Sequence, residues 1–335
     1  MRFLAIAGVG LIGGATVLAA QAAPARAGGN DLVMSRLGDI KLDGLGQPID
    51  VIGRNLDYRS LASELGVVMA PRLLTPSDTL GFGGFQFAVD MQATSITNDA
   101  DYWRALESSQ NPGGTGVDHG ESIMPTVGFF VRKGIWLPMP SFEVGLGAVH
   151  LLDSEMWAAQ GYVKFAMHEG FHDFPLPSVA VRGGGSRVMG TDQIDLSVGS
   201  LDISVSKDLG YQGTITVSPY GGWNVLWIVP RSEVIDKTPG IDTRADPSDI
   251  NMNFAFKDQQ TITRHRFFGG FKLQYYVFQL TFEAMIALPG SSVDDRSGTD
   301  MDCADIDPTR PTTSCDSTDQ SGTQETYTVS VGLDF

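Results

Sequence analysis

Hydrophobic and polar residues alternate with a period of two over most of the chain after residue 80. The last ten residues show this most clearly, because every second one is apolar: Tyr327, Val329, Val331, Leu333 and Phe335. An extended segment with this period has one apolar face and one polar face. The alternation therefore predicts β-strands that separate two different environments.

The same period recurs often enough to predict ten strands. Their ranges are 81–96, 121–132, 141–152, 157–168, 178–189, 193–206, 211–229, 264–275, 277–288 and 324–335. Within 193–206 the apolar positions change from even numbers, such as Val198, to odd numbers, such as Leu201. We interpret this change as a β-bulge near Gly199-Ser200. Eight or twelve strands are the alternatives, because the glycine-rich segments have a weaker pattern.

The links between these strands differ strongly in length. If consecutive strands are antiparallel, the three long links, 97–120, 230–263 and 289–323, all fall at one end of the sheet, and every link at the other end is short. Short turns at one end and long loops at the other are typical of transmembrane β-barrels. The predicted fold class is therefore all-β: a transmembrane antiparallel β-barrel of about ten strands, preceded by an N-terminal non-barrel segment.

The C-terminal strand, which ends on an aromatic residue, resembles the last strand of Gram-negative outer-membrane β-barrels. The resemblance covers Tyr327-x-Val329-x-Val331-x-Leu333-x-Phe335 and identifies no subfamily. It implies an outer-membrane location reached through the periplasm, recognition of this strand by the barrel-assembly machinery, and contact with membrane lipid and lipopolysaccharide.

The N-terminus has the pattern of a secretory signal peptide. Met1-Arg2 is followed by an apolar stretch from Phe3 to Ala20 and by the small-x-small sequence Ala25-Arg26-Ala27, which predicts cleavage after Ala27, or alternatively after Ala22. No other window offers the roughly 18 consecutive apolar residues of a transmembrane helix.

Residues 28–80 do not have the pattern of barrel wall. They predict a periplasmic lead-in or a segment that fills the lumen, with a short helix over Asp57–Leu65 capped by Asp57. An additional wall strand at Leu65–Met69 is the alternative. The barrel is expected to occupy residues 81–335.

The net charge argues against nucleic acid as a partner, and the two cysteines predict a disulfide. The net charge is −16, and loss of residues 1–27, whose only charges are Arg2 and Arg26, would make it −18. An acidic chain lacks the basic surface that nucleic-acid binding needs. Cys303 and Cys315 are the only cysteines, and in an exported chain they predict one local disulfide.

The loop 289–323 is strongly acidic and surrounds the two cysteines. Its densest carboxylates are Asp300, Asp302, Asp305 and Asp307. They are weak candidates for divalent-cation ligands because the spacing lacks the central glycine and terminal glutamate of an EF-hand loop. A solvated acidic surface is the alternative interpretation, and no cofactor is predicted.

Charged residues on the polar face of the strands are expected to line the lumen. The candidates are Asp90, Glu143, Lys164, Arg182, Arg264, Arg266, Lys272 and Glu283, together with Asp195, Asp202 and Asp334. Opposite charges here favour a polar plug, because a barrel of this size has little free interior. The alternative is a narrow solute path lined by Arg264, Arg266 and Lys272.

Aromatic residues near the strand ends are expected at the two membrane interfaces. They are Trp157, Tyr211, Trp223, Trp227, Tyr275, Tyr327 and Phe335. Trp223 and Trp227 could instead form a patch on which a sugar or lipid stacks.

Several histidines are candidate catalytic groups. His119, His150 and His265 are expected near the long loops, where a carboxylate partner would make a general base. The string His168-Glu169-Gly170-Phe171-His172 matches a zinc-hydrolase motif, but it falls on a predicted turn rather than on the helix that the motif needs.

The sequence therefore predicts a porin-like or structural envelope protein that is not an enzyme, with passive solute transport as one role. A surface-acting hydrolase and an adhesion protein that uses its loops are the alternatives.

Overall fold

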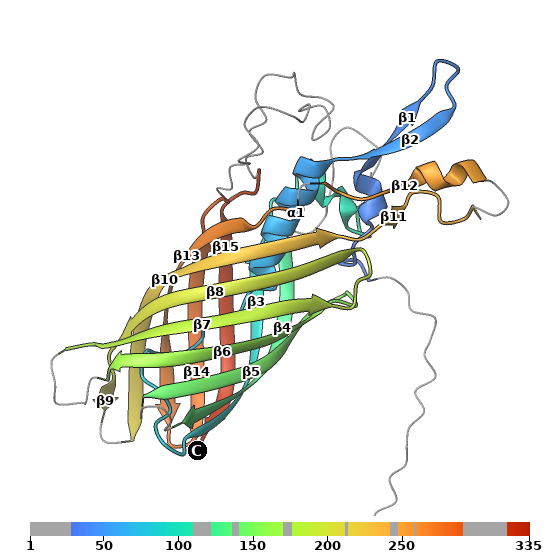
Figure 1. The fold of residues 1–335 in the computed structure, drawn as a ribbon. Coiled ribbons are helices and arrows are strands. Elements are labelled where there is room, and N and C mark those ends of the chain that lie inside the picture. Colours follow the sequence, from blue (N-terminus) through green and yellow to red (C-terminus); the bar gives the residue numbers. More distant parts are fainter. Residues whose placement is uncertain are drawn as a thin grey trace, which may run out of the picture.

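The chain folds into a closed antiparallel β-barrel in this computed structural model (Figure 1). The structure describes residues 28–109, 122–135, 141–169, 176–211, 214–241, 247–257, 259–290 and 320–335. The ten wall strands are β3 (Phe85–Ser95), β4 (Ile123–Ile135), β5 (Phe142–Leu151), β6 (Trp157–His168), β7 (Ser178–Met189), β8 (Ile194–Ser206), β10 (Ile215–Ser232), β13 (Ile262–Tyr275), β14 (Phe278–Ala287) and β15 (Gln324–Asp334).

Each wall strand pairs with its neighbours in sequence, and the last strand, β15, pairs with the first, β3. The short strand β9 (Leu209–Tyr211) pairs with the start of β10. The predicted ten-stranded antiparallel barrel is thus confirmed, although the first strand begins at Phe85 rather than residue 81. Tyr276 and Val277 form the expected tight turn between β13 and β14, and Tyr276 has a φ of 52°.

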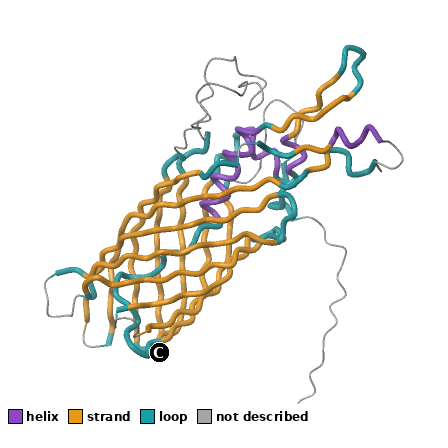
Figure 2. The backbone as a smooth tube through the Cα atoms, in the orientation of Figure 1, coloured by secondary structure: helices purple, strands orange, loops and turns teal. Residues whose placement is uncertain are grey.

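The two ends of the barrel differ as the link lengths predicted. We call the end that carries the links after β3, β5, β7, β10 and β14 the long-loop end, and the opposite end, where the C-terminus lies, the short-turn end (Figure 2). The three long links share the long-loop end, which confirms the predicted asymmetry.

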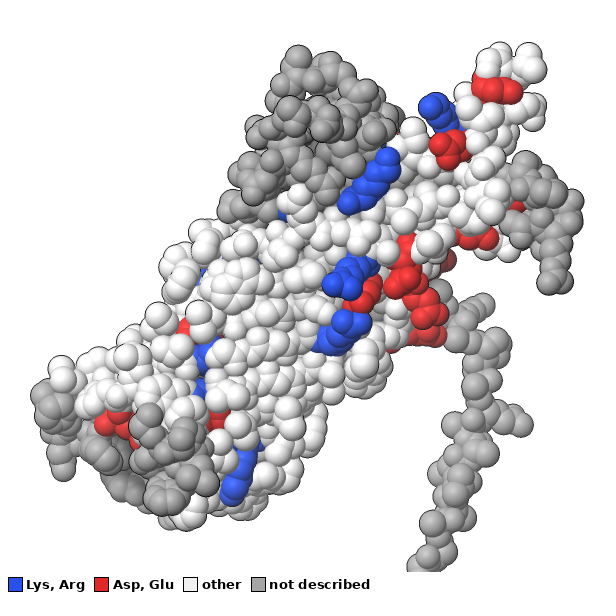
Figure 3. Space-filling view, viewed as in Figure 1, with Lys and Arg blue, Asp and Glu red and all other residues white. Residues whose placement is uncertain are grey.

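The outer surface of the wall is an apolar band. Outward side chains at mid-height include Val89, Phe129 and Phe271, all exposed, and the few outward charges, such as Lys133 and Arg187, lie next to strand ends. On the face shown in Figure 3, charged atoms gather toward the two ends and the band between them is mostly uncoloured. An exposed apolar surface this extensive is unfavourable in water and suits a lipid environment.

A cap made from the N-terminal segment and the long links closes the long-loop end. It contains η1 (Met34–Leu37), β1 (Gly38–Leu42), β2 (Pro48–Gly53), η2 (Asp101–Ala105), β11 (Ile235–Asp236), η3 (Pro247–Met252) and β12 (Asn253–Phe254). Residues 28–54 therefore lie at the long-loop end and not beside the short turns, where a periplasmic lead-in was expected.

The helix α1 (Asn55–Val68) follows the cap and enters the lumen (Figure 1). It is longer than the predicted Asp57–Leu65 helix and begins after Arg54 rather than at an Asp57 cap. The alternative of a wall strand at Leu65–Met69 is wrong, because these residues form the buried end of the helix.

The predicted β-bulge near Gly199-Ser200 is also wrong. Strand β8 pairs with β7 and β10 without any register shift, and its even-numbered residues face inward along its whole length. Ile194, Leu196 and Val198 are apolar and inward because they pack on the cap rather than on water. Asp195 consequently faces outward, where its Oδ2 is 2.7 Å from Nη2 of Arg187, and is not in the lumen.

Several predictions concern residues outside the described ranges. These are the signal peptide, the Cys303–Cys315 disulfide, the carboxylates Asp300, Asp302, Asp305 and Asp307, and His119. Within the described ranges, no helix is long and apolar enough to cross a membrane.

Candidate functional site

The lumen is occupied by residues 69–80, which we call the plug segment. It continues from α1 and runs through the lumen toward the short-turn end, where β3 begins (Figure 1). An extended segment has no internal partners for its peptide groups, so these groups need hydrogen bonds from the wall. The inward side chains supply them.

Hydrogen bonds from the wall follow the plug segment along its length. Near its start, Nε2 of Gln160 donates to the carbonyl oxygen of Ala70 at 3.0 Å, and Oγ of Ser186 donates to that of Met69 at 2.8 Å. Further along, the amide nitrogens donate to the wall: Leu74 to Glu283 Oε2 at 2.9 Å, Ser77 to Ser206 Oγ at 2.9 Å, and Leu80 to Glu143 Oε2 at 3.1 Å. The plug is thus bonded to strands on several sides of the barrel.

Three buried ion pairs lie in the lumen, two around the middle of the plug segment and one beside the short-turn end. The distances are 3.1 Å from Nε of Arg72 to Oδ1 of Asp90, 2.8 Å from Nε of Arg182 to Oδ2 of Asp202, and 3.2 Å from Nζ of Lys164 to Oε2 of Glu143. All six side chains are almost completely buried. Burial of an unpaired charge is costly. These charged groups are tolerated in the lumen because each is paired with an opposite charge and the pairs also bond the plug.

The ion-paired cations also hold the plug backbone. Nζ of Lys164 donates to the carbonyl oxygens of Pro76 at 3.2 Å and Asp78 at 2.8 Å, and Arg182 donates to the carbonyl of Leu73. Leu74, the next residue, has a φ of 28°, a region that residues with a Cβ rarely adopt. Its strained backbone is fixed by the bond to Glu283 described above.

Toward the long-loop end the buried residues are mostly apolar, and two of the buried charges, Glu64 and Arg264, join the cap to α1. Glu64 of α1 accepts hydrogen bonds from Thr97, Tyr102, Trp103 and Gly322. Arg264 of β13 donates to Ser63 of the same helix and to Ser321, both at 2.8 Å. These two side chains therefore connect α1 to the links after β3 and β14.

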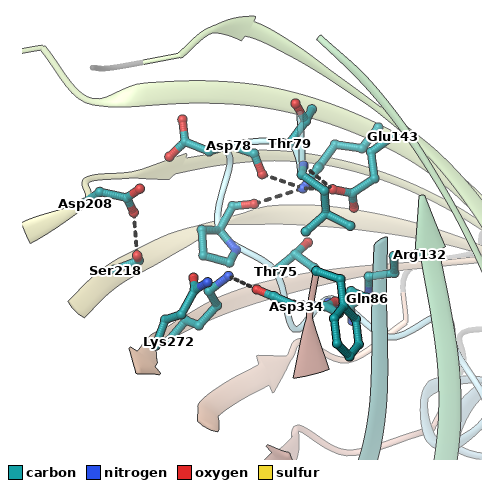
Figure 4. Close-up of a pocket in the computed structure, with 15 residues that line it drawn as sticks. Thr75, Asp78, Thr79, Gln86, Arg132, Glu143, Asp208, Ser218, Lys272 and Asp334 are labelled. Carbon is teal, nitrogen blue, oxygen red and sulfur yellow. Dashed lines mark hydrogen bonds and ion pairs between the residues drawn. The ribbon is translucent and has the colours of Figure 1, made fainter. Parts of the chain in front are cut away.

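At the short-turn end a polar cavity of about 260 Å³ remains beside the plug segment (Figure 4). One side of it is formed by Thr75, Pro76, Asp78, Thr79 and Leu80 of the plug. The wall contributes Gln86, Arg132, Glu143, Lys164, Asp208, Ser218, Lys272, Gln274 and Asp334. Nζ of Lys272 lies 2.9 Å from Oδ2 of Asp334 at this end.

The eight lumen-lining candidates all face inward, but the structure divides them among three places. Asp90, Arg182, Arg266 and Glu283 lie around the middle of the plug, Arg264 lies under the cap, and Glu143, Lys164 and Lys272 line the cavity. The trio proposed for a solute path does not line one passage. Arg264 holds the cap, Arg266 donates to Asn224 Oδ1 at 2.8 Å and to the Pro71 carbonyl, and Lys272 pairs with Asp334.

Sequence reasoning missed other residues of the lumen. Arg132 was available from the alternation of β4, since it follows the outward Val131. Glu64 and Arg72 gave no signal, because they belong to a segment without a period of two and are paired with residues far away in the sequence.

Most of the predicted interface aromatics are exposed on the outer wall. Trp157, Trp227 and Tyr327 lie in the halves of β6, β10 and β15 nearer the long-loop end. Trp223 lies near the middle of β10, and Tyr275 and Phe335 lie at the short-turn end. The side chain of Tyr211 is outside the described part of the structure.

The histidines that are described do not share a site. His150 stacks on Trp157 and His265 stacks on Trp223, both on the outer wall. His168 ends β6, and the neighbouring Glu169 accepts a hydrogen bond from Oγ1 of Thr79 at 2.6 Å. Among the described residues, no group of three or more histidine, cysteine, aspartate or glutamate side chains could hold a metal ion.

The closed wall, the apolar outer band and the unequal ends define the class of this protein as a transmembrane-type β-barrel with an occupied lumen. No protein-family model matches the chain, and a search of curated proteins finds no significant match.

Structure comparison finds solved outer-membrane barrels at very low sequence identity, among them Ail and OmpT. The attachment invasion locus protein Ail of Yersinia pestis is 9% identical, with a TM-score of 0.25 over 76% of this chain and 99% of Ail. The outer-membrane protease OmpT of Escherichia coli is 8% identical, with a TM-score of 0.31 over 78% of this chain and 98% of OmpT. These scores are too low to support an argument about function.

Proposed function

We propose that the protein is an outer-membrane barrel that its own N-terminal segment keeps closed, and that it acts as a structural envelope protein in this closed form. The observation that carries the proposal is the plug segment, whose backbone is bonded to inward side chains from the cap to the short-turn end. The long-loop end would face the cell exterior, because outer-membrane barrels place their long loops there.

Passive solute passage requires the plug segment to leave the lumen. A ten-stranded wall is only slightly wider than eight-stranded barrels, whose interiors side chains alone can fill, so the emptied lumen would be a narrow path. The inward charges that now hold the plug would then line that path and select solutes by charge.

Planar-bilayer recording tests the proposal directly. We expect the unmodified protein to give no steady conductance, and a variant that lacks residues 28–78 to give small open channels, provided that circular dichroism shows an intact barrel. Steady conductance from the unmodified protein would refute the proposal.

A cross-link provides a matched control for plug movement. Oγ of Ser77 on the plug lies 3.1 Å from Oγ of Ser204 on β8, so cysteines at both positions are close enough to form a disulfide. If a destabilised variant conducts because its plug moves, oxidation of the Ser77→Cys, Ser204→Cys pair in that variant should abolish the conductance, and reduction should restore it.

We keep the expectation that the chain is not an enzyme. The His150→Ala and His265→Ala variants test the hydrolase alternative, since loss of a surface hydrolytic activity in either would contradict this expectation.

A further inference from the structure

The cavity at the short-turn end contains one arginine without a carboxylate partner. Arg132 is 3% exposed, and its Nη1 donates to Oε1 of Gln86 at 2.6 Å and to the carbonyl oxygen of Leu74 at 3.4 Å. Its Nε is buried and has no hydrogen-bond partner among the described residues. No carboxylate in that part of the chain lies within 4.0 Å of its guanidinium.

The remaining nitrogen of Arg132 is available to a ligand. Nη2 makes no hydrogen bond with the described residues, yet it is not among their buried unsatisfied atoms, so it is accessible from the cavity that Arg132 lines. A buried guanidinium with unused donors is unfavourable unless an acceptor is supplied. An oxyanion in the cavity would supply one.

The other cations of the cavity are already neutralised. Lys164 pairs with Glu143 and Lys272 pairs with Asp334. Two carboxylates are left without a cation: Asp78 accepts a hydrogen bond from Oγ of Ser206 at 3.4 Å, and Asp208 accepts one from Oγ of Ser218. Among the described residues, neither lies within 4.0 Å of a lysine or arginine nitrogen.

The unpaired charges lie on opposite sides of the cavity. Figure 4 shows Arg132 beside Gln86 on one side, and Asp78 and Asp208 toward the other. A multiply charged anion would meet these carboxylates, and a simple cation would leave Arg132 unpaired. A molecule with one negative and one positive group complements both sides.

The volume limits the size of the ligand. A cavity of about 260 Å³ is slightly smaller than the roughly 300–1,000 Å³ of typical small-molecule sites. Since a water molecule occupies about 30 Å³ of the liquid, the space suits one solute of a few heavy atoms, together with some water.

We propose that this cavity binds a small zwitterion with an amino-acid-like charge pair. The carboxylate accepts hydrogen bonds from Arg132, and the ammonium group faces Asp78 and Asp208. The site opens toward the short-turn end and is complete while the plug segment is in place, so it does not depend on plug movement.

Isothermal titration calorimetry with the full-length protein in detergent tests the proposal. The probes are glycine and 4-aminobutyrate as zwitterions, acetate as the anion alone, ethylamine as the cation alone, and inorganic phosphate. We expect at least one zwitterion to bind more tightly than acetate, ethylamine and phosphate. Tighter binding of phosphate, or no binding of either zwitterion at millimolar concentration, would overturn the proposal.

Two variants on opposite sides of the cavity locate the binding. Arg132→Gln should weaken zwitterion binding by roughly 10- to 100-fold, because a charge-assisted hydrogen bond is lost. Asp208→Asn should weaken zwitterion binding but leave acetate binding unchanged, and it remains informative if Arg132→Gln does not fold, because Asp208 is only half-buried. Lys133→Gln is the matched control: it is the next residue of β4, points outward and should bind the zwitterion normally. Equal affinity of Asp208→Asn and the unmodified protein would overturn the assignment of the ammonium side.

Discussion

Replacement of Glu64 by glutamine should weaken the attachment of the cap to α1. The glutamate is completely buried in the helix that enters the lumen. Its Oε1 accepts hydrogen bonds from Oγ1 of Thr97 at 2.6 Å, the hydroxyl of Tyr102 at 2.8 Å and the amide of Gly322 at 3.1 Å. Its Oε2 accepts them from the amide of Thr97 at 3.0 Å and the indole of Trp103 at 2.8 Å.

The size of the effect follows from the way the hydrogen bonds are divided between the two carboxylate oxygens of Glu64. A glutamine side chain has one oxygen, so if that oxygen takes the place of Oε1, the amide group faces two N–H donors that lose their acceptor. Each hydrogen bond to a charged group contributes about 1.5–3 kcal/mol, so the loss is about 3 kcal/mol at the lower limit. The cap should then open about 100-fold more often, since 1.4 kcal/mol corresponds to a factor of ten.

Hydrogen exchange measures this opening at defined places. The backbone amides of Thr97 and Gly322 both donate to Glu64, and their exchange should accelerate by about 100-fold in Glu64→Gln, while amides in the middle of β6 and β7 should not change. Glu107→Gln is the control, because its ion pair with Arg36 at 3.1 Å lies at the surface, where Glu107 is exposed, and contributes little. Unchanged protection of Thr97 and Gly322 in Glu64→Gln would refute the reasoning.

Two further predictions concern the same helix. A Cβ added at Gly66 would lie 2.6 Å from Cδ1 of Ile228. Gly66→Ala should therefore destabilise the cap by about 1–3 kcal/mol, although alanine ordinarily favours a helix. Ile228→Ala in the same chain should restore part of the lost protection of α1 against hydrogen exchange. Burial raises the pKa of Asp57 above its ordinary 3.8, against the opposing effect of Arg54 and Arg104. The folded cap therefore binds the proton of the Asp57 carboxyl more tightly than the unfolded cap does. Protonation of Asp57 thus stabilises the folded cap fully below pH 3.8, and this stabilisation disappears as the pH rises through the raised pKa. Asp57→Asn should make α1 exchange more slowly at pH 7 and remove this part of the pH dependence, and equal exchange of the two proteins at pH 7 would contradict the prediction.

The wall could be predicted from the sequence because each strand carries its own evidence. An inward residue of β15 such as Thr328 and an outward residue such as Val329 differ in polarity, and this difference repeats over the whole strand. The rule needs no knowledge of the neighbouring strands, so ten strands and their link lengths follow from local pattern alone.

The cap and the plug could not be predicted in the same way. Their structure depends on single long-range contacts, such as Glu64 with Trp103 and Arg72 with Asp90, and no local period records such contacts. The alternation predicts that the charged residues of the lumen point inward, but it does not predict their ion-pair partners. Odd or even position identifies the face of a strand and not the residue on the other side of the lumen.

The error in β8 shows what the alternation encodes. If a period of two separates lipid from water, the apolar residues Ile194 and Val198 belong on the lipid face. In the structure both are buried against the cap, which makes the interior apolar at that height. Alternation therefore records the difference between two faces only where the interior is polar. Where α1 and the cap fill the lumen both faces are apolar, so a change of parity along a strand marks the depth at which the interior changes from polar to apolar.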